Sequence, residues 1–361
     1  MAFIPKPLKG RGAVSQPTGR FESRSVEALD DGWGSLEDSV TERIETQLFE
    51  ERTRSVISRN DSPDVSFDRS INPYRGCAHG CVYCYARPAH AYMNLSPGLD
   101  FETKIFWKPN AAEVLEQELR KPGYECQRIH IGGNTDPYQP VEKDLRVTRQ
   151  VLEVLLRFRH PVTLITKGAA LMMRDLDLIA EFAKHGLISI AVSITSLDDE
   201  LKRTLEPRTS SAKMRLRLIR ELSMRKVPTI VMAAPMIPFV NDMELEAILE
   251  AAAQAGATFA GYVTLRLPHE VEGIFQDWLE AHVPDRAAHV MSLVRQMQGG
   301  RAYNSEWGVR QTGSGQYAEL LAQRFQLACR RLKLNAAPRR PHDVSQFRVP
   351  DDRSGDQMRL L

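Results

Sequence analysis

The sequence predicts an α/β protein whose core is a partial (βα)6 barrel, similar to an incomplete TIM barrel with parallel strands. Short β-branched apolar runs begin near residue 66, and helical segments with an apolar face follow them. Continuous apolar runs that alternate with helices indicate a parallel sheet covered by helices. Six units suit an open or partial barrel better than a closed barrel of eight. A doubly wound sheet remains an alternative, because periodicity does not fix strand order.

The expected elements follow one another in a regular order. The first strand is expected near SFDRSINPY, and the next five strands at 128–133, 161–167, 188–194, 227–235 and 259–267. Amphipathic helices are expected at 144–160, 171–186, 215–226, 243–256 and 270–283. This core domain is expected to span residues 61–290.

Two extensions are expected to flank the core. Residues 1–60 lack a sustained apolar period, so we expect an N-terminal extension that is partly disordered or wraps the core. Its apolar residues could dock there: Trp33, Leu36, Val40 and Ile44. In the C-terminal extension, 291–361, Ser314 is expected to cap a helix that begins near Gln316. Its predicted apolar face carries Leu320, Leu321, Phe325 and Cys329.

Composition indicates an ordinary globular protein of a reducing compartment. Hydrophobic residues make up 42% of the chain and charged residues 26%, with a net charge of +2. The first residues contain no apolar signal segment, and the longest apolar stretch, IVMAAPMIPFV, carries two prolines. Three of the five cysteines are clustered, and without a secretory signal such a cluster more often binds metal than forms disulfides. We expect a cytoplasmic protein with no membrane segment.

The stretch NPYRGCAHGCVYCYARPAH places Cys77, Cys81 and Cys84 within eight positions, in the spacing C-x3-C-x2-C. Three thiolates complete a tetrahedral zinc site only with a fourth ligand, which His79 or His90 could supply. A four-iron cluster explains an odd count of three better, because three thiolates leave one iron open to another ligand.

This spacing, with Tyr83 before the last cysteine and a loop after the first strand, resembles the signature of the radical S-adenosylmethionine (SAM) enzymes. The resemblance implies a [4Fe–4S] cluster held by Cys77, Cys81 and Cys84, with SAM bound to the open iron. It also implies that the reduced cluster cleaves SAM to a 5′-deoxyadenosyl radical, which removes a hydrogen atom from the substrate. An electron donor of the flavodoxin or ferredoxin type is expected.

Special residues also follow the later strands, and the carboxyl ends of parallel strands share one mouth. By resemblance, Gly132 and Gly133 would let the backbone bind the SAM amino group, although a tight turn explains the same glycines. Lys167 could pair with the SAM carboxylate, or instead with Asp136 or Glu206. The other expected SAM contacts are Tyr83, Asn134, Thr135, Ser193, Thr195 and Ile237.

Residues 66–290 are similar to the spore photoproduct lyase-like branch, which includes proteins labelled DNA repair photolyase-like. Those lyases carry a cysteine at the end of the second strand that returns hydrogen to the substrate radical. Here the stretch reads GGNTDPYQP, and Cys126 lies at the opposite end of that strand. Thymine-dimer reversal is therefore not assigned, and the candidate hydrogen donors are Tyr138 and a cysteine from another protein.

Three functions stay open at this point. The first is a radical SAM enzyme with an unidentified substrate, for which nucleic acid is favoured by the branch. The basic stretch 324–348 also favours it, since seven Lys or Arg stand there against one Asp. The second is a radical SAM enzyme that modifies a peptide or protein, which predicts further cluster cysteines. The third is a Cys3His zinc module that binds nucleic acid without catalysis.

Overall fold

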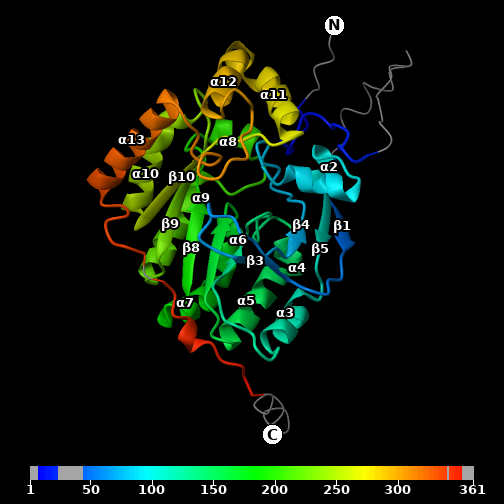
Figure 1. Cartoon of the computed structure of the whole chain (residues 1–361), viewed down its shortest axis with the longest axis vertical. Coiled ribbons are helices and arrows are strands. Elements are labelled where there is room, and N and C mark those ends of the chain that lie inside the picture. The colour runs from blue at the N-terminus through cyan, green and yellow to red at the C-terminus, as the bar shows by residue number, and fades with distance from the viewer. Residues whose placement is uncertain (1–6, 23–43, 340, 352–361) are drawn as a thin grey trace.

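A seven-stranded sheet forms the centre of the molecule (Figure 1). The computed structural model describes residues 7–22, 44–339 and 341–351. In spatial order the strands are β10 (Phe259–Thr264), β9 (Thr229–Met236), β8 (Ile188–Ser193), β7 (Val162–Thr166), β6 (Ile129–Ile131), β3 (Arg69–Ile71) and β2 (Ile57–Arg59). The pairs from β10 to β3 are parallel, and β2 is antiparallel to β3. The predicted partial barrel of six parallel strands is confirmed, and β2 is an edge strand that was not predicted.

The segments between the strands form a helical layer on the outer face of the sheet. Its longer helices are α3 (Ala111–Leu119), α5 (Val147–Arg157), α7 (Leu176–Lys184), α9 (Ala212–Met224) and α10 (Leu245–Gln254). Shorter elements complete the connections: α4 (Glu142–Leu145), α6 (Ala169–Met172), η2 (Met173–Asp175), α8 (Asp199–Leu205) and η3 (Asp242–Glu244). The amphipathic helices expected from the sequence are therefore present, with ends shifted by a few residues.

Residues of β8 alternate between the two faces of the sheet, as the two-residue period of a strand requires. Ile188, Ile190 and Val192 are fully buried in the main apolar core, together with residues of α7 and α9. The intervening side chains are small: Ser189, Ala191 and Ser193. These line the inner face of the sheet, where they leave space that larger side chains would fill.

A second, three-stranded sheet packs beside the barrel and was not predicted. It has the order β1 (Gln47–Glu50), β5 (Lys104–Trp107) and β4 (Tyr74–Arg75). Between β4 and β5 lie η1 (Arg87–Met93) and α2 (Leu99–Thr103). Residues 44–60 thus contribute strands to both sheets. Ile44 is 38% exposed, and Trp33, Leu36 and Val40 lie outside the described residues.

Three longer helices follow β10, namely α11 (Val271–His282), α12 (Pro284–Met297) and α13 (Gln316–Leu332), with η4 (Val344–Gln346) near the end. α13 begins where predicted, but the predicted cap is wrong. Gly315 occupies the N-cap position, whereas the Ser314 hydroxyl lies 3.5 Å from the Met297 carbonyl oxygen. Leu321 and Cys329 are buried and Phe325 is partly buried, but Leu320 is 52% exposed. The apolar face of α13 is therefore narrower than the sequence indicated.

No helix in the described ranges combines the length and hydropathy that crossing a bilayer requires.

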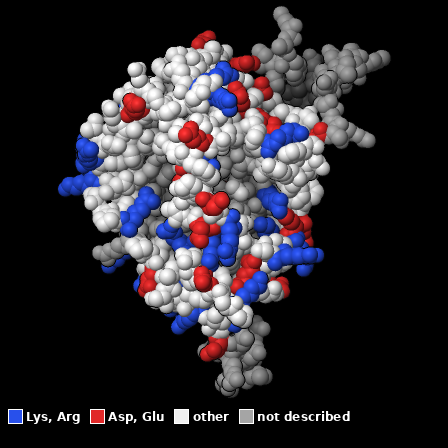
Figure 2. Space-filling view, in the orientation of Figure 1, with Lys and Arg blue, Asp and Glu red and all other residues white. Residues whose placement is uncertain are grey.

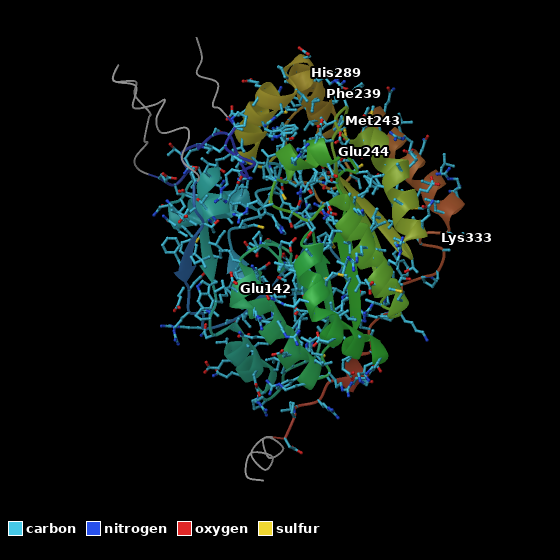
Figure 3. The ribbon with its side chains drawn as sticks, turned by 180° about the vertical axis from the view of Figure 1, so that it is seen from behind. Glu142, Phe239, Met243, Glu244, His289 and Lys333 are labelled. Atoms are coloured by element: carbon cyan, nitrogen blue, oxygen red, sulfur yellow. The ribbon has the colours of Figure 1, made fainter. Side chains whose placement is uncertain are left out.

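On the outer surface, Phe239, Met243 and His289 lie near one another at one end of the molecule (Figure 3). The rings of Phe239 and His289 meet edge to face, 4.6 Å apart.

Candidate active site

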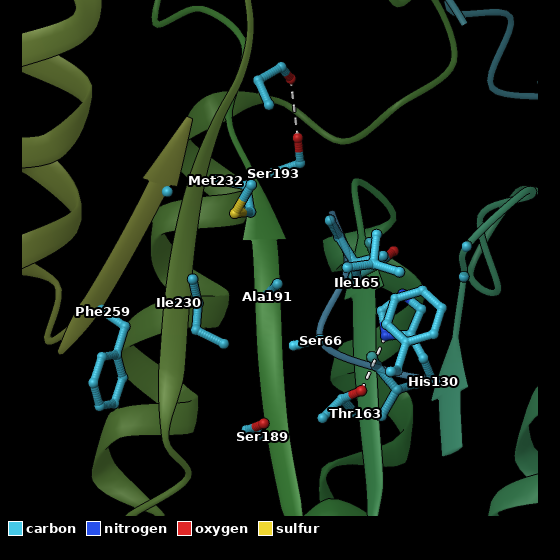
Figure 4. Close-up of a pocket in the computed structure, with 18 of the residues that line it drawn as sticks. Ser66, His130, Thr163, Ile165, Ser189, Ala191, Ser193, Ile230, Met232 and Phe259 are labelled. Atoms are coloured by element: carbon cyan, nitrogen blue, oxygen red, sulfur yellow. Dashed lines mark hydrogen bonds between the residues drawn. The ribbon is translucent and has the colours of Figure 1, made fainter. Parts of the chain in front are cut away.

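A cavity of about 1300 Å3 occupies the hollow of the barrel (Figure 4). Its mouth lies at the carboxyl ends of the strands, where the cysteine loop, Gly132, Lys167, Ser193 and Arg266 all line it. From there it follows the inner face of the sheet to the C-terminal residues 337–339 and 341–343. The predicted convergence of strand-end residues on one mouth is thus present in the structure.

All three clustered cysteines line this cavity. Cys77 and Cys81 are 7% and 9% exposed, and Cys84 is partly buried. Burial, Asp136 and the neighbouring Cys84 raise the pKa of Cys77 to about 12. Burial and Glu206 likewise raise the pKa of Cys81 well above its usual value. The thiols are therefore close enough to repel one another when ionised, and binding as thiolates requires a cation that offsets this cost.

The donor set fits an iron–sulfur cluster better than one zinc ion. Within the described residues, no three His, Cys, Asp or Glu side chains converge closely enough for a single metal ion. His79 Nδ1 lies 3.3 Å from Asp136 Oδ2, and His90 Nε2 lies 3.1 Å from the Lys104 carbonyl oxygen. His90 is fully buried and does not line the cavity that the thiols line, so it is not placed to complete a zinc site with them. A cluster spaces its thiolates farther apart than one zinc ion does and needs only the three cysteines.

Buried polar groups fix the backbone of the cysteine loop. The Gln139 side chain, which is fully buried, accepts a hydrogen bond from the Ala78 N–H at 2.8 Å and donates to the Gly76 carbonyl at 3.2 Å. These two bonds bracket Cys77. On the far side, the Val82 N–H donates to the Leu205 carbonyl at 3.0 Å. The loop is therefore anchored from two directions before any ligand binds.

Gly132 and Gly133 form the turn after β6, but only Gly132 is constrained by the protein. Gly132 has a φ of +101°, and a Cβ there would lie 2.6 Å from the Ile165 carbonyl oxygen. A Cβ on Gly133 would meet only ordinary contacts, with His130 at 3.7 Å and Phe67 at 3.9 Å. The tight-turn explanation therefore accounts for Gly132, whereas nothing in the described fold requires the second glycine.

Lys167 follows β7 and turns its side chain into the mouth. Its Nζ donates to Ser193 Oγ at 3.0 Å and lies 3.9 Å from Glu206 Oε1. It also lies 5.7 Å from the centre of the Tyr83 ring. Asp136, the other expected partner, instead accepts from the Lys167 backbone N–H at 2.6 Å. The ammonium is 18% exposed and has donor capacity left for an anionic ligand.

A buried ionic network lies behind Lys167. The Glu206 carboxylate, 1% exposed, accepts from the Tyr83 hydroxyl, the Thr195 hydroxyl and the Arg215 guanidinium. Although burial alone raises the pKa of Glu206, the charges of Arg215 and Lys167 lower it to about 2. Glu206 is thus ionised at neutral pH and holds Tyr83 and Thr195 in place.

Not every predicted site residue reaches the cavity. Asn134 and Thr135 line it beside the glycines, but Thr195 and Ile237 are buried behind its wall. At the carboxyl end of β9 the residues that line the cavity are Ala234 and Pro235 instead of Ile237. The sequence predicted where each strand ends, but it did not predict which residue near that end points into the cavity.

The candidacy of Tyr138 does not fit the structure. Its side chain is fully buried and does not line the cavity. Burial, Asp175 and Glu142 raise the pKa of its hydroxyl well above the usual value. Figure 3 shows Glu142 from behind, on the helical side of the sheet. Because Tyr138 faces this outer network, it cannot serve as the hydrogen donor in this arrangement.

The part of the cavity that lies below its mouth, along the inner face of the sheet, is here called the inner chamber. It has an aromatic wall that was not predicted from the sequence. The His130 ring stacks on Phe67 with centroids 4.1 Å apart, and His130 Nδ1 lies 3.0 Å from Thr163 Oγ1. Strand pairing sets His130, Thr163 and Ser189 in one row across the sheet. The sequence did contain an indication of this chamber, because the inward positions of β6, β7 and β8 carry polar residues. A packed barrel core would carry large apolar residues there.

The mouth carries a further aromatic residue, Tyr85, directly after Cys84. The Arg266 guanidinium lies 4.2 Å from the centre of the Tyr85 ring, and the Tyr85 hydroxyl donates to the Gly133 carbonyl. Both residues line the cavity. They connect the cysteine loop with the glycine turn and with the end of β10.

Ion pairs and a ring contact hold the described part of the basic C-terminal stretch against the barrel. Arg324 pairs with Glu246 at 2.6 Å, and Arg331 lies 3.5 Å from Glu250, both on α10. Arg339 lines the floor of the cavity, 5.3 Å from the Phe259 ring centre. Figure 2 shows acidic and basic side chains interspersed over the face in view. The stretch therefore packs on the barrel and closes its lower end.

Comparison with known proteins agrees with this geometry. The family model described as the radical SAM superfamily matches residues 71–252, which run from the first parallel strand through α10. The chain belongs to the radical SAM superfamily and is an enzyme of that class.

Among curated proteins, it is 38% identical to an uncharacterized protein of Mycobacterium tuberculosis strain H37Rv, over 64% of this chain and 68% of that protein. It is also 26% identical to an uncharacterized protein of Methanocaldococcus jannaschii, over 55% and 71% of the two chains. Among solved structures it is similar to spore photoproduct lyase complexed with dinucleoside spore photoproduct, with a TM-score of 0.56, 14% identity and 79% of each chain covered. At that identity the likeness shows a shared fold.

Proposed function

We propose that this enzyme holds a [4Fe–4S] cluster through Cys77, Cys81 and Cys84 and binds SAM at the mouth of the barrel. The single observation that carries the proposal is the opening of the three thiols, the glycine turn and Lys167 into one cavity. The family makes SAM and such a cluster the expected cofactors. When bound, they supply an organic radical that removes a hydrogen atom from the substrate.

The residues of the mouth would position SAM by complementary charge and shape. The Lys167 ammonium, held by Ser193, would donate to the SAM carboxylate. Because Gly133 has no side chain, its backbone would allow the amino group of SAM to approach closely. Tyr83 would form part of the wall with its ring, because its hydroxyl is already bonded to Glu206 and Thr195.

The chamber below would receive the substrate, and its lining favours a nucleotide unit. The Phe67–His130 stack offers an aromatic surface for a base, and Thr163 and Ser189 offer hydroxyl groups at the same level. Arg128, Arg266 and Arg339 line the cavity and could pair with phosphate. The structurally similar spore photoproduct lyase is known in complex with dinucleoside spore photoproduct, which supports the same substrate class.

Photoproduct reversal itself is not proposed. All five cysteines are described, and Cys126 and Cys329 lie outside the cavity. No cysteine beyond the three proposed ligands thus lines the site. The same placement disfavours peptide modification that relies on further cluster cysteines. The zinc-module alternative is disfavoured because no three His, Cys, Asp or Glu side chains of the described residues converge on a single-ion site. We further propose an electron donor of the flavodoxin or ferredoxin type and a cytoplasmic location.

The chemistry is tested by anaerobic reconstitution with iron and sulfide, followed by an assay for 5′-deoxyadenosine from SAM under a strong reductant. We expect about four irons per chain and SAM cleavage, with both reduced together in Cys81→Ala. Cys126→Ala is the matched control and should behave as wild type. A colourless protein with one zinc, or full cleavage by Cys81→Ala, would contradict the ligand set.

The substrate class is tested by filling the chamber. Ala191→Leu places a large side chain at the middle of β8, between Ile165 and Ile230 in the neighbouring strands. We expect this variant to cleave SAM as wild type does but to bind a thymidine dinucleotide at least about tenfold more weakly, a loss of about 1.4 kcal/mol. Equal dinucleotide binding by the two proteins would argue against a nucleotide in the chamber.

A further inference from the structure

An N-terminal segment far from the cysteines in sequence covers their loop. Residues 11–14, here called the strap, are all buried, with Ala13 fully inaccessible. Ala13 belongs to the same apolar cluster as Cys81, Val82 and Tyr83. The chain continues beside α2, where Leu99 N–H donates to the Gln16 side chain at 2.6 Å, and Arg20 pairs with Glu270 at α11. Figure 1 shows this blue segment running past α2 toward α11.

A buried carboxylate holds the strap in place. Glu102 is fully buried, and its two oxygens accept from the Gly12 N–H at 3.0 Å and the Ala13 N–H at 2.8 Å. The Arg11 guanidinium donates to the Glu102 carbonyl at 3.0 Å. Two adjacent backbone donors of the strap are thus satisfied by one charged group, which makes this contact stronger than a pair of neutral hydrogen bonds.

The same carboxylate is tied to the cysteine loop through Arg87. Arg87 is fully buried and contacts Glu102 at 2.5 Å, while its Nε donates to the Cys81 carbonyl at 3.0 Å. The charge of Glu102 is therefore shared between the strap on one side and the arginine that fixes Cys81 on the other. Breaking a buried pair of this kind leaves an unpaired charge in the interior, so the two sides are energetically coupled.

Gly12 makes the closest approach between the strap and the loop. A Cβ at this position would lie 1.9 Å from the Gly80 carbonyl oxygen, 3.1 Å from the Gly80 carbonyl carbon and 3.3 Å from the Val82 backbone nitrogen. These are main-chain atoms of the loop between Cys77 and Cys84, and they cannot move aside as a flexible side chain can. Only glycine permits this contact with the loop that carries the thiols.

We propose that the strap seals the outer side of the cysteine loop and shields the cluster from solvent and oxidants, with Gly12 and Glu102 as its positioning residues. The inference rests on the cluster proposed above. Solvent access and backbone hydrogen bonds are among the features that set the stability and potential of an iron–sulfur cluster. The cavity would then be the main route to the cluster, because the strap closes the opposite side.

The test compares Gly12→Ala with Gly273→Ala, an exposed helical glycine where an added Cβ meets no atom within 4 Å. Both proteins are reconstituted anaerobically, and the loss of visible cluster absorbance is timed in air-saturated buffer without SAM. We expect Gly12→Ala to bleach at least about fivefold faster than wild type, because local opening then takes less free energy. Gly273→Ala should bleach as wild type. Equal rates in all three proteins would overturn the proposal.

A second measurement needs no variant and covers the case in which Gly12→Ala does not fold. In the anaerobic wild-type protein, the Gly12 and Ala13 amides should exchange hydrogen as slowly as the amides of β8. Exchange as fast as in an unstructured peptide would overturn the strap. If wild type binds no iron, the proposed function fails; if it binds iron normally and these amides are unprotected, only the present inference fails.

Discussion

Gly132 and Gly133 are adjacent at the mouth but are constrained for different reasons, and this difference can be measured. Gly132→Ala should destabilise the protein by about 1–3 kcal/mol, because its φ of +101° and the Ile165 carbonyl both oppose a side chain. Gly133→Ala should change the free energy of unfolding by less than about 0.5 kcal/mol. It should instead weaken SAM binding by about tenfold, because the new methyl group occupies the cavity side.

Denaturant unfolding and SAM titration of both variants separate these effects. Each variant is the control for the other, since the substitution is the same and the positions are adjacent. If Gly133→Ala bound SAM as wild type does, the backbone at this turn would not contact the cofactor. If Gly132→Ala were as stable as wild type, the turn would not depend on its positive φ.

At the residue scale, the sequence predicted which residue types form the site better than it predicted which way each side chain points. The cysteine spacing and the placement of Lys167 after a strand pointed to residues that do line the cavity. Tyr138 does not line the cavity, because the chain turns after Asp136 and buries its side chain on the outer face. The Phe67–His130 stack was missed because it joins two segments about sixty residues apart, and only strand pairing brings them together.

At the scale of elements, the C-terminal residues 337–339 and 341–348 act as the floor of the barrel. His342 contacts Ser189 Oγ at 3.2 Å and the Gly186 carbonyl at 3.0 Å. Phe347 packs against the rings of Tyr124, Phe158 and His160, with centroids 5.4–6.2 Å apart. These contacts attach the segment to the amino-terminal end of the sheet, opposite the cysteines.

Phe347→Ala should therefore loosen this floor. We expect a loss of about 1–2 kcal/mol in the free energy of unfolding, less than for a fully buried phenylalanine, because Phe347 is only partly buried. Limited trypsin digestion should cut after Arg339 or Arg348 sooner than in wild type. Val349→Ala, a substitution at a 48% exposed position in the same segment, is the control. Unchanged stability and cleavage in Phe347→Ala would show that the segment is not anchored by this ring.

The six parallel strands were predictable because their outward faces carry an apolar residue at every second position, as in β7 and β8. β1, β4 and β5 were not, since they span two to four residues and β1 is exposed throughout. Such strands form because neighbouring segments of the same chain supply their hydrogen bonds, and this leaves no periodic pattern in the sequence. The strap was missed for a similar reason: its burial depends on Glu102, about ninety residues later.

At the scale of the whole molecule, stability should depend on pH through a buried histidine. His160 is fully buried beside Tyr124, and burial lowers its pKa from 6.5 to about 4. In the unfolded chain it takes up a proton near its ordinary pKa, whereas the folded protein keeps it neutral. The unfolded state thus binds more protons between these values, so the free energy of unfolding falls as pH falls from about 6.5 toward about 4.

The expected slope is about 1.4 kcal/mol per pH unit in the middle of this window for one such group. It is measured by denaturant unfolding of the iron-free protein between about pH 7 and about pH 5. His160→Asn should show a flatter dependence than wild type, even though its stability at neutral pH is lower. The same slope in both proteins would mean that His160 does not remain neutral in the folded state.

The central claim is that one open cluster site and one SAM site meet at the mouth of this barrel. The most direct measurement is the electron paramagnetic resonance spectrum of the reduced, reconstituted protein before and after SAM is added. If SAM completes the ligand set left open by Cys77, Cys81 and Cys84, the spectrum of the cluster will change on addition, and the Gly133→Ala protein will need more SAM for the same change. A cluster spectrum that SAM leaves unaltered at saturating concentration would contradict the account.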